Sequence, residues 1–382
     1  MRAQIKLVRL FGVELGLHYS WLIIAVLIVF SLGDHFHLIH PGWSPTVVWS
    51  ISVAAGVLFF VFLFAHELSH ALVAKARGLP IHKITLFALG GMAQIEKEPE
   101  RASTEFWMGI IGPITSFVIG VVLLAIATAL GWKWSWGWSS EARTPGVAML
   151  VWLGRINIAL AVFNMIPGFP LDGGRVLRAI IWGITKSADR STQIAARIGQ
   201  LVGIGFILYG ILEFFHNEAF GGLWLAFIGW FLMNAAGASY MQLKASNALA
   251  GVSVGQVMSQ DCQAVEGHIS LQDFVDHFLL RTGRRCFLVV DNGRPLGLIT
   301  PVEVRHVPRD DWAVTSVQAA MKPLERIHSV TPETPVMSAM EVMAREDVNQ
   351  LPVVSDGHLA GILSRAHVLE LLRARSEMGS SR

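Results

Sequence analysis

The chain of 382 residues is strongly apolar, since 53% of its residues are hydrophobic and only 15% are charged. This composition excludes an ordinary soluble enzyme and is typical of a membrane-embedded protein. The formal net charge of +2, without a run of basic residues, does not indicate nucleic acid as a partner. Apolar residues are concentrated before about residue 245, which predicts a membrane unit followed by a soluble unit.

Two short segments of the membrane unit have the alternation of a β-strand. Apolar and polar side chains alternate from Phe11 to His18, and again in 81–95, which contains the pair Gly90-Gly91. The pattern predicts a small sheet at the rim of the membrane unit, with 81–95 folded as a hairpin around the glycines. The orientation derived below makes this the cytoplasmic rim. An exposed edge of this sheet could hold an extended peptide by strand addition. The alternative is a sheet that only closes the fold.

Six apolar segments are long enough to span a bilayer. They are residues 20–38, 47–74, 104–130, 147–166, 196–215 and 222–243. Six spans put both termini on one side, where most of the Lys and Arg residues lie, whereas the opposite loops hold only Lys133 and Arg143. The positive-inside rule then places both termini and the soluble unit in the cytoplasm, and predicts a multi-pass protein of the cell membrane.

The second predicted span contains the sequence His66-Glu67-Leu68-Ser69-His70. Two histidines four residues apart lie on one face of a helix and can bind one zinc ion, with the intervening glutamate placed to deprotonate a water. Ionisable groups inside a span are costly without a partner or a metal. The motif therefore predicts a zinc site with Glu67 as the catalytic residue. The alternative is a pair of histidines satisfied by ordinary hydrogen bonds.

Depth in the membrane restricts the choice of a third protein ligand, which a catalytic zinc site typically has. His35, His37 and His40 have a suitable spacing but follow the first span on the outer side. His70 is about five residues from Lys75, so the motif lies roughly 7–14 Å below the inner surface at 1.5 Å per residue. The outer histidines are most of a bilayer away and are excluded.

A broken helical segment, Asn164 to Arg175, lies at the inner end of the fourth span. Its prolines interrupt the helix, and irregular backbone at membrane depth is tolerated only where it is buried in protein or lines a wet cavity. Asp172 is the predicted third ligand, although it also suits the N-cap of a short helix that runs to about Trp182. Gly173-Gly174 would let the backbone approach the metal, and Asn164 could donate a hydrogen bond to a substrate carbonyl or its oxyanion.

Several motifs of residues 1–245 occur together in this chain. They are His-Glu-Leu-Ser-His at 66–70, the Gly90-Gly91 hairpin, Gly112-Pro113, and the segment 164–174 with Leu-Asp-Gly at 171–173. Together they resemble the site-2 protease family of intramembrane zinc metalloproteases. The resemblance implies one zinc ion held by His66, His70 and Asp172, with Glu67 as the catalytic residue. It also implies cleavage of a transmembrane helix of a single-span membrane protein, such as a membrane-tethered regulator, near the cytoplasmic face.

The soluble unit repeats itself with a period of about 64 residues, because 254–258 recurs as 317–321 and 288–300 recurs as 352–364. Each copy predicts a short helix, a strand, a helix, two strands around an Asn-Gly or Asp-Gly turn, and a final helix. The repeat resembles a tandem pair of CBS domains, with copies at about 252–306 and 315–372.

The resemblance to CBS pairs implies regulation by ATP, ADP or AMP. Nucleotide sites of this family often place an acidic residue three positions after Ser or Thr to hold ribose hydroxyls, and Thr300 and Glu303 fit this pattern. Ser364 and His367 depart from it, which leaves at most one well-formed site. The alternative is a module for homodimerisation or docking without a ligand.

The predicted fold class is a polytopic α-helical membrane protein with about six transmembrane helices and a small cytoplasmic-side sheet or hairpin, followed by an α/β tandem CBS pair. The predicted domains are 1–245 and 246–382. The alternative function is a transporter or channel gated by its CBS pair, which would show internal membrane repeats with paired broken helices. Arg155 in the fourth span has no assigned role; it pairs with Glu213 or lines a cavity.

Overall fold

The computed structural model describes residues 5–79, 81–87, 90–95, 99–133, 144–217, 220–259, 263–282, 286–292, 294–323, 327–346, 348–355 and 358–379. The chain divides into two compact units, Met1–Met241 and Gln242–Arg382. Each unit has hydrophobic cores of its own.

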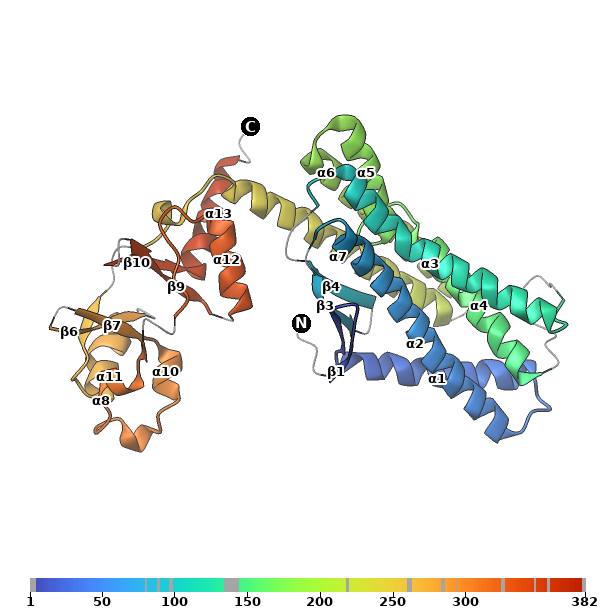
Figure 1. Cartoon of the computed structure of the whole chain (residues 1–382), viewed down its shortest axis with the longest axis horizontal. Coiled ribbons are helices and arrows are strands. Elements are labelled where there is room, and N and C mark those ends of the chain that lie inside the picture. The colour runs from blue at the N-terminus through green and yellow to red at the C-terminus, as the bar shows by residue number, and fades with distance from the viewer. Residues whose placement is uncertain are drawn as a thin grey trace. The chain divides into compact units, whose positions relative to one another are not determined.

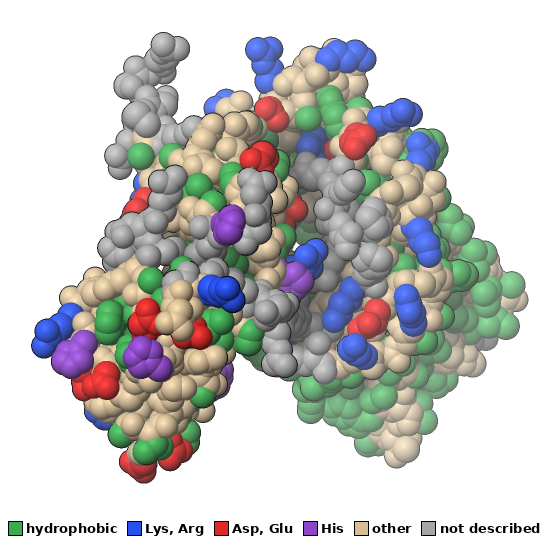
Figure 2. Space-filling model, turned by 60° about the vertical axis from the view of Figure 1, so that its left-hand side comes forward, with side chains coloured by type: hydrophobic (Ala, Val, Ile, Leu, Met, Phe, Trp, Pro, Cys, Tyr) green, Lys and Arg blue, Asp and Glu red, His purple; other side chains and the backbone are tan. Residues whose placement is uncertain are grey.

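Six helices in the described part of the chain are long and apolar enough to cross a membrane. They are α1 (Ser20–Ile39), α2 (Pro45–Ala76), α3 (Ala102–Ala129), α4 (Pro145–Asn164), α6 (Ala188–Asn217) and α7 (Phe220–Leu249) (Figure 1). In each helix at most 39% of the most apolar window is buried, so most of these side chains face outward, as contact with lipid requires. Figure 2 shows hydrophobic side chains gathered in one region of the surface, with Lys and Arg side chains mainly outside it. The six predicted spans are confirmed.

Helices α3 and α4 pack closely because small residues face each other. A Cβ atom added to Gly120 would lie 2.8 Å from the carbonyl oxygen of Gly154, and one added to Gly154 would lie 3.1 Å from that of Gly120. Any larger side chain at either position would push the two backbones apart. Helix α3 also packs against α2, and these three helices lie side by side in Figure 1.

A four-stranded sheet lies beside α2. Its strands are β1 (Ile5–Leu10), β2 (Val13–Leu17), β3 (Ile81–Phe87) and β4 (Gly90–Ile95), in the order β1-β2-β3-β4. Strands β2 and β3 are parallel and the other pairs are antiparallel. Val13, Leu15 and Ile84 form a core with Ala71 and Ala74 near the C-terminal end of α2.

The sheet differs in two details from its prediction. The hairpin of 81–95 is present, but Gly90 and Gly91 are the first residues of β4, and the connecting residues 88–89 lie outside the described part. The predicted strand from Phe11 begins only at Val13. Phe11 and Gly12 have φ values of 51° and 82°, so they form a turn, and residues 5–10 supply a further strand.

The second unit contains two small sheets. Strands β5 (Ala264–Glu266), β6 (Phe287–Asp291), β7 (Arg294–Ile299) and β8 (Lys322–Pro323) form the sheet β5-β6-β7-β8, and β9 (Gln350–Ser355) pairs with β10 (His358–Ser364). Its helical segments are η1 (Val254–Gln256), α8 (Leu271–Phe274), η2 (Val275–Leu279), α9 (Leu280–Thr282), α10 (Pro301–Arg305), η3 (Arg309–Asp311), α11 (Val317–Ala320), α12 (Val336–Arg345) and α13 (Arg365–Gly379).

The backbones of the two sequence copies of this unit pair with each other. Strand β8 belongs to the second copy and pairs with β7 of the first. Ser259 of the first copy forms a bridge with Ile362 of the second, through hydrogen bonds of 2.9 Å. The copies therefore fold as one unit rather than as independent domains. The predicted Asn-Gly and Asp-Gly turns include residues 293 and 356–357, which lie outside the described part.

Candidate metal centre

Helix α2 contains two buried histidines one turn apart. The helix begins after Ser44, whose side chain accepts a hydrogen bond from the amide of Val47, and has Pro45 in its first turn. His66 and His70 are only 3% and 7% exposed. Their Nε2 atoms lie 3.2 Å apart, so the four-residue spacing brings both rings to one point.

Asp172 reaches the same point from α5 (Asp172–Thr185), about a hundred residues later in the chain. Its Oδ2 atom lies 3.2 Å from Nε2 of His66 and 3.2 Å from Nε2 of His70. The N-cap of α5 is Leu171, and Asp172 is the first helical residue. The interpretation of Asp172 as an N-cap is therefore wrong, because its carboxylate contacts the two imidazoles instead.

The environment of Asp172 keeps its carboxylate ionised. Burial alone would raise the pKa of Asp172, but without a metal the two imidazoles in their protonated form, through hydrogen bonds and charge, hold this pKa well below its ordinary value. An ionised carboxylate is the form that binds a metal.

The three ligand atoms fit a zinc ion. Zinc bonds of about 2.0–2.2 Å in a tetrahedral arrangement place ligand atoms roughly 3.4 Å apart, and the three atoms here are mutually 3.2 Å apart. Three protein ligands leave the fourth position open, as in catalytic zinc sites. Within the described ranges, these residues are the one group of three or more metal-ligating side chains close enough to share an ion.

Glu67 and Asn164, the other two predicted site residues, belong to different elements. Glu67 follows His66 on α2, is half-buried, and lies close enough for its charge to act on His70. Asn164 is the last residue of α4, is partly exposed, and stands at the start of the segment that leads to Asp172.

The chain is similar to known proteins over most of its length. The family model of peptidase family M50 matches residues 54–208, and that of the CBS domain matches 254–310 and 317–374. The protein sll0528 of Synechocystis, named as a zinc metalloprotease, is 30% identical over 98% of this chain and 96% of its own length. The chain belongs to peptidase family M50.

Two further similarities extend the comparison of this M50 peptidase. Rip3 of Mycobacterium tuberculosis, also named as a zinc metalloprotease, is 31% identical over 97% of this chain and 93% of its own. The solved structure of a site-2 protease from Methanocaldococcus jannaschii is 30% identical, covers 62% of this chain and 94% of that chain, and has a TM-score of 0.42.

The predicted resemblances to site-2 proteases and to a tandem CBS pair are confirmed, and so is the enzyme class, a metalloprotease. Family membership implies zinc as the metal and intramembrane proteolysis as the general activity. The same membership favours a peptidase over the alternative of a transporter or channel.

The segment between α4 and α5 is packed against protein. The amide of Phe169 donates a hydrogen bond of 3.3 Å to the carbonyl of Ala195 on α6. A Cβ atom on Gly173 would lie 2.5 Å from the carbonyl oxygen of Ile166, and one on Gly174 would lie 2.4 Å from the amide nitrogen of Phe169. The two glycines thus let this segment fold back onto α5, which differs from their predicted role of bringing the backbone to the metal.

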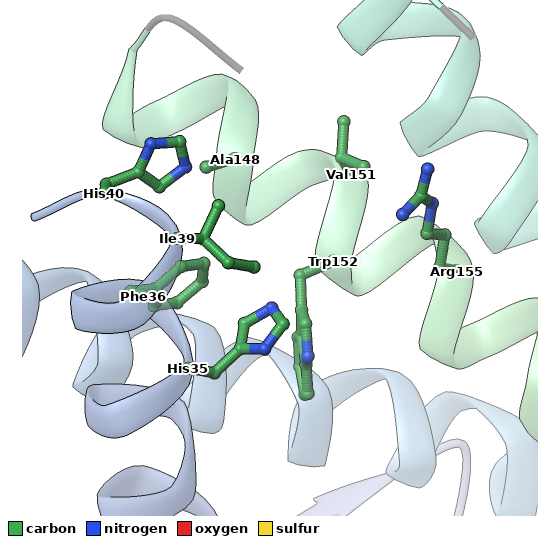
Figure 3. A pocket seen from close by; sticks show the side chains of 8 residues that line it. All are labelled: His35, Phe36, Ile39, His40, Ala148, Val151, Trp152 and Arg155. Carbon is green, nitrogen blue, oxygen red and sulfur yellow. The ribbon is translucent and has the colours of Figure 1, made fainter. Parts of the chain in front are cut away.

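Two of the three histidines that were excluded by depth, His35 and His40, line a separate cavity. This small cavity of about 10 Å³ is also lined by Trp152 and Arg155 (Figure 3). The guanidinium carbon of Arg155 lies 5.5 Å from the ring centre of Trp132. Arg155 is one of the residues that line this cavity, which is one of its two predicted placements.

Thr300 and Glu303 form a capping box at the start of α10. The Thr300 amide donates a hydrogen bond of 2.9 Å to Glu303 Oε2, and the Thr300 hydroxyl donates to the same carboxylate. The Val302 amide donates to Thr300 Oγ1 at 3.1 Å. The two predicted nucleotide-binding side chains therefore hydrogen-bond one another at the start of α10, through Oε2 of Glu303.

Two partners of the histidines had no sequence prediction. His66 Nδ1 lies 2.9 Å from Ser116 Oγ, and His70 Nδ1 bonds the carbonyl of Met108. Both partners lie on α3, some 40–50 residues from the histidines. The one sequence signal is a serine inside an apolar span, which is too common to indicate a site.

Proposed function

We propose that this chain is an intramembrane zinc endopeptidase that cleaves transmembrane segments of single-span membrane proteins near the cytoplasmic face. The main support is the meeting of His66, His70 and Asp172, with ligand atoms 3.2 Å apart, among helices long and apolar enough to span a bilayer. Membership of a peptidase family supports hydrolysis of a peptide bond.

Each residue of the site has a separate task in this proposal. His66, His70 and Asp172 would hold the metal with two nitrogens and one oxygen. When bound, zinc supplies Lewis acidity, which polarises a carbonyl and makes water acidic enough to ionise near neutral pH. Glu67 accepts the proton of the attacking water and passes it to the leaving amine. The side-chain amide of Asn164 donates a hydrogen bond to the substrate carbonyl oxygen.

The substrate must be locally unwound, because a carbonyl within a helix is already hydrogen-bonded. Strand β4 is the last strand of its sheet, so its outer edge is placed to accept an extended peptide by strand addition. Hydrogen exchange of residues 90–95 tests this role. Slower exchange with a substrate helix supports it, and unchanged exchange leaves the sheet as an element that only closes the fold.

The distribution of Lys and Arg supports a topology with both termini and the CBS pair in the cytoplasm. A reporter that fluoresces only in the cytoplasm, fused after Arg382, tests this topology. Fluorescence supports it, and its absence from a well-expressed fusion contradicts it.

The CBS pair is proposed to regulate the protease, either by binding an adenine nucleotide or by dimerisation. Thr300 and Glu303 are the candidate ribose contacts, supported by their spacing and by the CBS family match. Calorimetric titration of the full chain with ATP, ADP and AMP, with Glu303→Gln as the comparison, tests the first role. Absence of binding would leave dimerisation or docking as the function of the pair.

Cleavage of a model transmembrane helix by the purified full chain tests the proposed activity. Glu67→Gln should keep one zinc per chain and lower kcat by about 10²–10⁴-fold, the range that general acid–base catalysis contributes. Glu100→Gln is the matched control, because Glu100 is exposed and lies between the sheet and α3. Loss of zinc from Glu67→Gln would contradict the assigned role of Glu67.

A further inference from the structure

Helix α3 supplies none of the three metal ligands, yet both histidines lie against it. Met108, Gly112 and Ser116 follow one another at intervals of four, so they share one face of this helix. All three are buried, with Met108 1% and Ser116 0% exposed. We call these three residues the α3 histidine face.

The two ends of this face bond the Nδ1 atoms of the histidines. The carbonyl of Met108 can only accept a hydrogen bond, so the Nδ1 atom of His70 must carry the proton. Ser116 Oγ, 2.9 Å from His66 Nδ1, can accept from His66 in the same way. A neutral imidazole with its proton on Nδ1 leaves Nε2 unprotonated, and Nε2 is the atom that faces Asp172 in both residues.

The centre of the face provides the space for both Nε2 atoms. A Cβ atom added to Gly112 would lie 2.1 Å from Nε2 of His70 and 2.7 Å from Nε2 of His66. Real Cβ atoms essentially never approach so closely, so any side chain at this position would displace the rings. Glycine at 112 is therefore required by the position of the two ligand nitrogens.

We propose that the α3 histidine face is a positioning template for the metal site. The Met108 carbonyl and the Ser116 hydroxyl fix the tautomer and rotation of the two rings, and Gly112 leaves room for their Nε2 atoms to converge on Asp172. Outer partners of metal-binding histidines act in this way in other metal sites, and their loss typically costs 10–100-fold in metal affinity. This inference rests on the proposed zinc site.

Zinc affinity of the full-length protein in detergent, measured by competition with a chelator, tests the template. Ser116→Ala removes one oxygen and should lower zinc affinity 10–100-fold, whereas Ser116→Thr, which restores a hydroxyl, should recover most of the loss. Gly112→Ala should lower zinc affinity further. The cobalt-substituted protein supplies a second readout, because displaced rings should change its visible absorption spectrum.

The chain offers a matched control for each substitution. Ser52 is also 0% exposed, but its hydroxyl donates to the carbonyl of Val48 on its own helix, so Ser52→Ala should leave zinc affinity unchanged. Gly205 lies in a membrane helix with nothing within 4 Å of an added Cβ atom, so Gly205→Ala should be equally neutral.

The outcomes separate the template from the proposed function. If the wild type binds one zinc and both Ser116→Ala and Gly112→Ala bind it equally tightly, the template is refuted and the zinc site stands. If the wild type binds no zinc, the proposed function and the template fall together. If Gly112→Ala does not fold, the zinc affinities of Ser116→Ala and Ser116→Thr decide whether the template holds.

Discussion

The ion pair between Glu105 of α3 and Arg178 of α5 anchors the helix that begins with Asp172. Arg178 Nη1 lies 2.9 Å from Glu105 Oε1, and the two side chains are only 12% and 1% exposed. The guanidinium of Arg178 also lies 5.8 Å from the ring centre of Trp182. Removing one partner of a buried ion pair is strongly destabilising, so Arg178→Met should lower the free energy of unfolding by about 3–5 kcal/mol.

A double-mutant cycle measures this anchor by unfolding the protein with SDS in detergent micelles. Glu105→Leu and Arg178→Met should each be strongly destabilising, whereas the double variant replaces the pair by apolar side chains and should lie close to the wild type. Lys6→Met is the control, because Lys6 is 73% exposed where it pairs with Glu14 and should change stability very little. A loss below about 1 kcal/mol for Arg178→Met, or strict additivity in the double variant, would refute the anchor.

Four further predictions concern the metal site. Asp172→Asn should lower zinc affinity by more than the roughly 100-fold that an outer-shell partner is worth, and unchanged affinity in chelator competition would remove Asp172 from the ligand set. Zinc at a hundred times its Kd should stabilise the apoprotein by about 2.7 kcal/mol in the same SDS titration, and equal stability with and without zinc would argue against a site formed only on folding. His35→Ala and His40→Ala should each retain one zinc per chain by atomic absorption, since both residues line the separate cavity; lost zinc would overturn the argument from membrane depth. Asn164→Ala should lower kcat for a model helix by about 10²–10³-fold with zinc retained, and an unchanged kcat would exclude an oxyanion role.

The spans and the meeting of the three candidate ligands could be predicted from the sequence because strong physical constraints act on them. A bilayer imposes long apolar segments, and the six helices follow these segments to within a few residues except for longer α6 and α7. The four-residue spacing of His66 and His70 fixes their common helix face. Depth in the membrane then selected Asp172 over the outer histidines, and the structure brings its carboxylate to both rings.

Contacts between distant helices could not be predicted in this way. Ser116 is 50 residues from His66, and no local pattern connects a serine of one span with a histidine of another. The first strand, residues 5–10, depends on a turn in which Phe11 adopts a positive φ, which non-glycine residues rarely do. The N-cap interpretation of Asp172 failed because tertiary contacts with two imidazoles determine where its carboxylate lies.

Zinc K-edge X-ray absorption of the full-length Glu67→Gln protein tests the central claim most directly, because this variant should keep its metal without turning over substrate. We expect one zinc per chain, with two imidazole nitrogens and one carboxylate oxygen from His66, His70 and Asp172. Absence of zinc, a third imidazole or a sulfur ligand in the spectrum would contradict the proposed metal centre.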